Sequence, residues 1–135
     1  MKEYLLKDDI KVFCVTAKSF PDGVQQAFIT LEKMLSKEGR TFYGISHGTP
    51  SGEIIYKAAV TEKYEGEGKE YDFESYIIPM GKYITETIRD FMNNMNRFGE
   101  IFKEMLAHPQ LDKSSACVEW YKTDSEVMCM VKLIS

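Results

Sequence analysis

The sequence of 135 residues is poor in the residues that build disulfide frameworks and metal sites. It has three cysteines, an odd number without Cys-x-x-Cys spacing, and only two histidines. A disulfide-stapled or zinc-binding domain needs more of both residue types in closer spacing. The sequence also lacks a Walker loop, a dinucleotide-binding fingerprint and the Ser-His-Asp arrangement of a catalytic triad. We therefore expect no metal and no cofactor.

An excess of basic residues and long apolar runs are also missing. Lysine and arginine total 17 against 21 for aspartate and glutamate, which gives a net charge of -4 and a pI near 5.3. Such a balance disfavours direct contact with a nucleic-acid backbone. No apolar run approaches the roughly 18 residues that a membrane-spanning helix needs, and the N-terminus has no signal-peptide pattern. The expectation is a cytoplasmic protein that binds neither nucleic acid nor membrane.

What is present fits one folded domain. Hydrophobic residues make up 44% and charged residues 28% of the chain, which is close to the average for globular domains. A domain typically has roughly 100–200 residues, so residues 1–135 are expected to form a single domain.

The apolar pattern changes period along the chain. A helical period predicts helices over residues 24–35 and 95–106, with Asp22 as a capping residue of the first. Segments rich in β-branched and aromatic residues predict strands, with Pro79–Gly81 interrupting the fourth. The predicted strands cover residues 11–17, 41–47, 54–62, 73–88, 116–122 and 127–134. The charged stretch 65–70 is expected to be too polar to pack and to divide the chain into halves.

The two halves share an order of strand, helix, strand, strand at an offset of 71 residues, as between Met34 and Met105. This predicts an internal duplication with repeats of about 8–64 and 71–135. The expected fold is α+β: duplicated strand-helix-strand-strand units, an antiparallel sheet with two helices on one face, and a ligand groove between the halves.

Two short runs resemble one known family. Residues Ile78–Tyr83 are similar to an "iPaGkY" strand and Val118–Tyr121 to an "E-x-Y" element of GyrI-like domains, the effector-binding domains of bacterial MerR-type and AraC-type regulators. The resemblance implies a multidrug-binding module linked to transcription regulation or drug sequestration. No helix-turn-helix precedes the domain, so DNA reading by this chain is not expected. Thr87–Phe91 replaces the family's small-residue loop, so contacts of that loop are not carried over.

Glu119 is the first candidate for a ligand-binding residue. It lies within an apolar strand, and Tyr121 must share its face because strand side chains alternate. The resemblance implies that this pair attracts lipophilic cations by charge and stacking. The alternative is that Glu119 lies on a solvated face while Trp120 is a core residue. Further ligand-binding candidates are Trp120, Tyr43, Tyr83 and His47.

Three functions remain open at this point. A stand-alone binding protein for a small molecule, lipophilic or cationic, is the leading interpretation. The first alternative is a GyrI-like hydrolase of reactive small molecules, in which Glu119 and Tyr121 would be catalytic. The second is an inhibitor that binds a protein partner, either a topoisomerase or a separate regulator.

Overall fold

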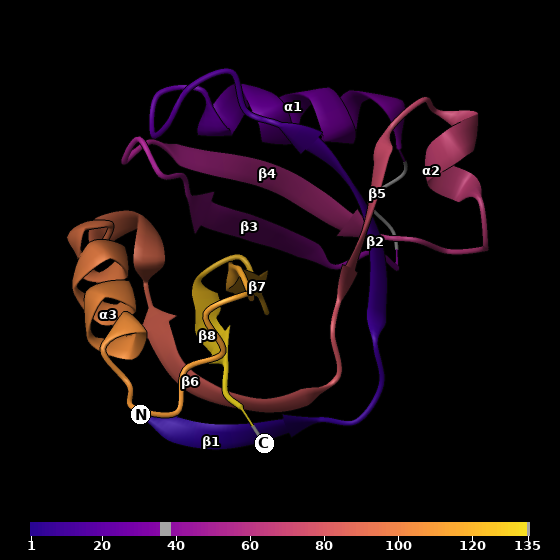
Figure 1. The fold of residues 1–135 in the computed structure, drawn as a ribbon. Helices are drawn as coiled ribbons and strands as arrows, with labels where there is room; N and C mark the ends of the chain where they lie inside the picture. The colour runs from indigo at the N-terminus through magenta and orange to yellow at the C-terminus, as the bar shows by residue number, and fades with distance from the viewer. Residues whose placement is uncertain (36–38, 135) are drawn as a thin grey trace. The chain divides into compact units, whose positions relative to one another are not determined.

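The computed structural model describes residues 1–35 and 39–134 (Figure 1). The chain forms two compact units: unit 1 comprises Met1–Asp8 with Pro79–Ser135, and unit 2 comprises Asp9–Ile78. Both combine an antiparallel sheet with helices, which confirms the α+β class. None of the helices formed by the described residues is long and apolar enough to cross a membrane.

Unit 2 is a four-stranded antiparallel sheet with a helix on one face. Its strands are β2 (Ile10–Thr16), β3 (Phe42–Gly48), β4 (Ile54–Thr61) and β5 (Glu74–Ile78), in the spatial order β3-β4-β2-β5. Its helices are α1 (Val24–Met34) and the short α2 (Glu67–Glu70). Helix α1 buries Ala27 and Leu31 against Phe13 and Val60 of the sheet.

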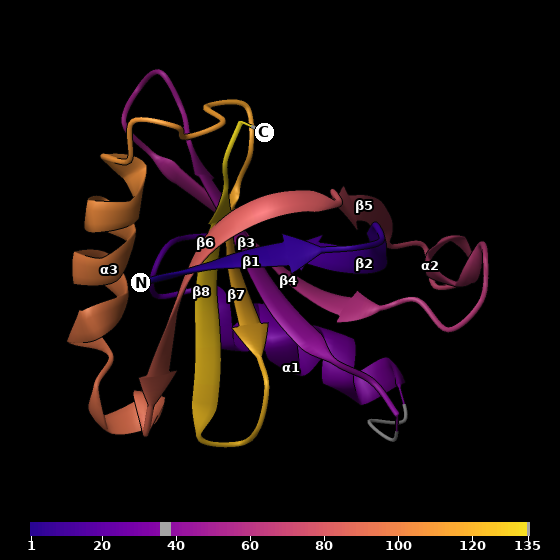
Figure 2. The same cartoon turned by 90° about the horizontal axis from the view of Figure 1, so that it is seen from below.

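Unit 1 repeats this arrangement. Its strands are β1 (Lys2–Leu6), β6 (Gly81–Arg89), β7 (Cys117–Tyr121) and β8 (Glu126–Lys132), in the spatial order β1-β6-β8-β7. A 3-10 turn, η1 (Phe91–Asn93), precedes helix α3 (Asn96–Leu106), which lies beside β6 and β8 (Figure 2). Helix α3 buries Ile101 and Met105 against Ile84 and Val131.

The predicted strand-helix-strand-strand order is confirmed in both halves, as β2-α1-β3-β4 and β6-α3-β7-β8. The predicted break is also found, because β5 ends at Ile78 and β6 begins at Gly81. Each sheet has a fourth strand that comes from the other half of the sequence: β1 pairs with β6, and β5 pairs with β2. The repeat limits of about 8–64 and 71–135 stay a prediction.

Two local expectations are wrong. The stretch 65–70 does pack: it contains α2, where Glu67 is only 2% exposed and Gly68 is buried. A buried ion pair with Arg40 compensates for the charge of Glu67. Asp22 does not cap α1, because the helix starts one residue later, after Gly23, and has no side-chain cap.

Two glycines offer a matched test of this packing. A Cβ atom added at Gly68 would lie 2.6 Å from the Cβ of Phe13, whereas one added at Gly99 in α3 meets no atom within 4 Å. We expect Gly68→Ala to destabilise the protein by about 1–3 kcal/mol through overpacking. Gly99→Ala is expected to stabilise it by about 0.5–1 kcal/mol. Urea denaturation measures both, and equal effects would contradict the close packing of α2 on β2.

Candidate functional site

Glu119 and Tyr121 lie together on strand β7, as the alternation of strand side chains predicts. The Tyr121 hydroxyl donates a hydrogen bond to Oε1 of Glu119 at 2.7 Å. Both side chains are partly buried. The structure thus joins two of the residues that the sequence predicts to bind a ligand.

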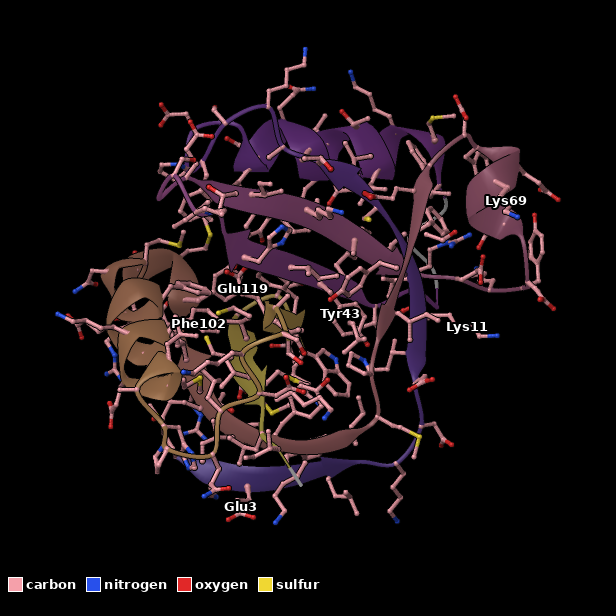
Figure 3. The ribbon with its side chains drawn as sticks, in the orientation of Figure 1. Glu3, Lys11, Tyr43, Lys69, Phe102 and Glu119 are labelled. Atoms are coloured by element: carbon pink, nitrogen blue, oxygen red, sulfur yellow. The ribbon has the colours of Figure 1, made fainter. Side chains whose placement is uncertain are left out.

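Aromatic rings pack beside Tyr121 on the side of the sheet that carries α3. The rings of Tyr121 and Phe91 pack edge-to-face with centroids 5.4 Å apart, and those of Phe91 and Phe98 do so at 6.4 Å. Phe102 of α3 packs against the same core cluster (Figure 3, where Phe102 and Glu119 are labelled). We call these five residues, Glu119, Tyr121, Phe91, Phe98 and Phe102, the acidic aromatic face of unit 1.

A second carboxylate lies on the same side of the sheet. Cys129 of β8 pairs with Glu119 of β7 on one side and with Glu86 of β6 on the other. Directly opposed residues share a face, so the two glutamates flank Cys129 at a backbone separation of roughly 10 Å, twice the strand spacing. Glu86 also forms an ion pair of 3.1 Å with the α-amino group of Met1. This face therefore carries two carboxylates within apolar surroundings, and the α-amino group of Met1 balances the charge of Glu86.

Burial and the nearby carboxylates raise the pKa of the two cysteine thiols on this face. Burial raises the pKa of Cys117 to about 11, and the nearby Glu119 contributes to the shift. Burial also raises the pKa of Cys129, with Glu119, Cys117 and Glu86 adding to it. Both groups are therefore protonated thiols at neutral pH and are poor nucleophiles.

Trp120 and Tyr83 lie on the opposite side of the unit 1 sheet. Consecutive strand residues point to opposite faces, so Trp120 cannot share the face of Glu119. The rings of Trp120 and Tyr4 pack edge-to-face with centroids 6.2 Å apart, and the Lys122 ammonium lies 3.3 Å from the centroid of Trp120. Tyr83 is buried, and its hydroxyl donates to the carbonyl oxygen of Pro79 at 2.5 Å. Within unit 1, these candidates thus form a separate set from Glu119 and Tyr121.

Tyr43 and His47 belong to strand β3 of unit 2. Tyr43 is buried opposite Ala59, while its neighbour Phe42 packs against Phe28 of α1. Tyr43 therefore points away from α1. His47 pairs with Ile55 near the hairpin and is exposed. Their role in ligand binding stays a prediction.

Three residues at this site lie outside the sequence prediction, although each carries a local signal. Phe98 and Phe102 fall in the apolar stripe of the second predicted helix, a pattern that indicates core residues. Glu86 interrupts the apolar alternation of Ile84 and Ile88 in β6, which is the same signal that identified Glu119. Among residues 1–35 and 39–134, no three His, Cys, Asp or Glu side chains are placed to hold a metal ion.

Comparisons with known proteins define the fold class but not a family. No protein-family model matches the sequence, and no curated protein sequence matches it. Solved structures do match over almost the whole chain. An integron cassette protein of Vibrio cholerae, VCH_CASS2, has 11% sequence identity and a TM-score of 0.71, and the match covers 98% of this chain and 94% of that one.

Two further structures share this fold. SAV2435, solved bound to tetraphenylphosphonium, has 12% identity and a TM-score of 0.62, with 98% of this chain and 92% of that chain covered. A hydrolase from Listeria innocua has 12% identity and a TM-score of 0.53, with 98% and 90% covered. At such identities the likeness concerns the fold alone, and it agrees with the fold that the GyrI-like resemblance implies.

Proposed function

We propose that this protein is a GyrI-like binding protein for lipophilic cations, with the acidic aromatic face of unit 1 as its binding surface. The observation that carries the proposal is the Glu119 carboxylate, hydrogen-bonded to Tyr121 beside three phenylalanines. In the families that the sequence resembles, such binding serves transcription regulation or drug sequestration.

The chemistry of this face suits a cation that is also apolar. A partly desolvated carboxylate attracts a positive charge more strongly than an exposed one, because fewer water molecules screen it. The rings of Tyr121 and Phe91 are partly buried and offer apolar and π surface to the substituents of such a cation. Glu86 lies on the same side of the sheet, but its charge is balanced by the Met1 α-amino group, so Glu119 is the carboxylate that we assign to the cation. A strongly hydrated ion such as a metal ion gains less here, since the rings cannot replace its water.

Two likenesses to other proteins support this choice. SAV2435, which shares the fold over nearly its full length, was solved with tetraphenylphosphonium, a lipophilic cation. The "E-x-Y" element that resembles GyrI-like domains corresponds to Glu119 and Tyr121.

A hydrolase is the second candidate, because the Tyr121–Glu119 hydrogen bond orients a carboxylate that is able to act as a general base. A fold neighbour from Listeria innocua is described as a hydrolase. A hydrolase would alter its ligand chemically. Mass spectrometry after incubation with a reactive, cyclopropane-bearing compound separates the two functions.

The proposal is tested with two ligands of matched shape and opposite charge. Isothermal titration calorimetry with tetraphenylphosphonium is expected to give saturable binding, which weakens as ionic strength rises. Tetraphenylborate has the same four rings around an anionic centre and is expected not to bind. Equal binding of both ions would indicate nonspecific hydrophobic contact and would contradict recognition by charge.

A further inference from the structure

Unit 2 contains a cavity of about 520 Å³ that the proposed function does not use. It lies between the connection from β2 to α1, Thr16–Phe20, and the end of the β3–β4 hairpin, Gly52–Ile55. Its volume falls within the roughly 300–1,000 Å³ that is typical of small-molecule sites. All of its lining residues belong to unit 2.

The first wall of this cavity, formed by Thr16–Phe20, is held in place by backbone hydrogen bonds and ring contacts. The amide of Ala17 donates to the carbonyl oxygen of Tyr56 at 2.8 Å. The ring of Phe20 stacks on the ring of Tyr56, with centroids 5.8 Å apart and an angle of 23°. Tyr56 is itself buried in the sheet. The connection is therefore anchored to β4 before any ligand arrives, which lowers the entropic cost of binding.

The second wall, formed by Gly52–Ile55, is held in place by hydrogen bonds in the turn of the β3–β4 hairpin. The amide of Gly52 donates to the carbonyl oxygen of Thr49 at 2.9 Å, and the amide of Thr49 donates to the carbonyl oxygen of Glu53 at 2.9 Å. The Thr49 hydroxyl also donates to the carbonyl oxygen of Glu53 at 3.2 Å. These bonds set the position of the Glu53 backbone at the cavity.

The lining combines apolar surface with two opposite charges. Phe20 and Ile54 are 44% and 47% exposed, so each wall presents one large apolar side chain to the cavity. Lys18 lies on the first wall and Glu53 on the second. Neither has an ion-pair partner within 4.0 Å among the residues that the structure describes. Both charges are thus available to a ligand.

We infer that this cavity binds a free α-amino acid with an apolar side chain. The ligand carboxylate pairs with the Lys18 ammonium, and the ligand ammonium pairs with the Glu53 carboxylate. The apolar side chain covers Phe20 and Ile54, and an aromatic one stacks on the Phe20 ring. The Glu53 carboxylate would repel a purely anionic ligand, and the Lys18 ammonium would repel a purely cationic one. A zwitterion forms a favourable ion pair with each of the two side chains.

The test uses L-phenylalanine and two analogues that each lack one charge. In 15N-labelled protein, L-phenylalanine is expected to cause saturable amide shifts confined to residues 16–20 and 52–55 and their neighbours. N-acetyl-L-phenylalanine lacks the ammonium and L-phenylalaninamide lacks the carboxylate. Each is expected to bind at least about tenfold more weakly, because one charged hydrogen bond is lost.

Variants of the two walls complete the test. Lys18→Met and Glu53→Gln are each expected to weaken L-phenylalanine binding by about tenfold or more. Lys33→Met on α1 and Glu65→Gln near α2 change the same charges at exposed positions outside the cavity and are expected to leave the affinity unchanged. Absence of saturable shifts, equal affinity of either analogue, or unchanged affinity in the wall variants would each overturn the inference.

Discussion

Replacing Glu67 by glutamine is expected to lower the free energy of unfolding by about 3–5 kcal/mol. The Glu67 and Arg40 side chains are 2% and 5% exposed and form an ion pair. Oε1 of Glu67 accepts hydrogen bonds from Nη1 of Arg40 at 3.0 Å and from the amide of Lys63 at 2.9 Å. The substitution keeps the shape of the side chain but removes the countercharge from a buried guanidinium, and that charge is expensive to keep out of water.

The pH dependence of this effect follows from the direction of the pKa shift. The hydrogen bond from Arg40 holds the pKa of Glu67 below its usual range. A carboxyl group with a lowered pKa in the folded state contributes stability above its unfolded pKa of about 4.3 and loses that contribution as pH falls through the folded value. The difference between wild type and Glu67→Gln should therefore be largest near neutral pH and shrink below about pH 4.

Urea denaturation at several pH values measures both quantities. Glu65→Gln changes the same charge two residues away at an exposed position and is expected to stay within about 0.5 kcal/mol of wild type. If Glu67→Gln alone does not fold, the double variant Arg40→Met/Glu67→Met tests the same idea, because removal of both charges should restore much of the stability. A single variant as stable as wild type at pH 7 would show that the pair is not structurally important.

The elements that could be predicted from the sequence have local signals. The apolar stripe containing Leu31 predicts α1, and the stripe containing Ile101 predicts α3 to within a residue or two. The glycines at 48 and 52 predict the β3–β4 hairpin. No local pattern predicts β1, because its partner strand β6 is distant in the sequence: the Thr85 hydroxyl donates to the carbonyl oxygen of Lys2, 83 positions away. No window of neighbouring residues contains that information.

For charged residues, too, the sequence predicts what depends on near neighbours and not what depends on distant ones. The local sequence around Glu67 predicts a solvated stretch, because the residue that pairs with Glu67 and permits its burial, Arg40, lies 27 positions earlier. For Glu119 and Tyr121, alternation along one strand was sufficient to predict a shared face. It also excludes Trp120 from that face. The neighbours of Glu119 across the sheet, Cys129 and Glu86, depend on the register between strands, which long-range pairing sets.

Glu119→Gln is expected to weaken the binding of tetraphenylphosphonium by about 10- to 100-fold. Interactions with a charged, partly buried group contribute roughly 1.5–3 kcal/mol, and each 1.4 kcal/mol corresponds to a factor of ten. The substitution keeps the size of the side chain and an oxygen that accepts the hydrogen bond from Tyr121, so the fold should persist. Calorimetric titration of both proteins, with circular dichroism to verify folding, measures the change.

Two further variants separate the charge of Glu119 from the general charge of the protein. Glu126→Gln removes a carboxylate from β8, but residue 126 alternates with the positions that face α3 and so belongs to the other side of the sheet. It is expected to change the affinity less than twofold, since exposed charges are screened. Tyr121→Phe keeps the ring but removes the hydroxyl, so an intermediate loss is expected. Equal losses for Glu119→Gln and Glu126→Gln would mean that tetraphenylphosphonium responds only to net charge, and unchanged affinity in Glu119→Gln would remove this carboxylate from the binding surface.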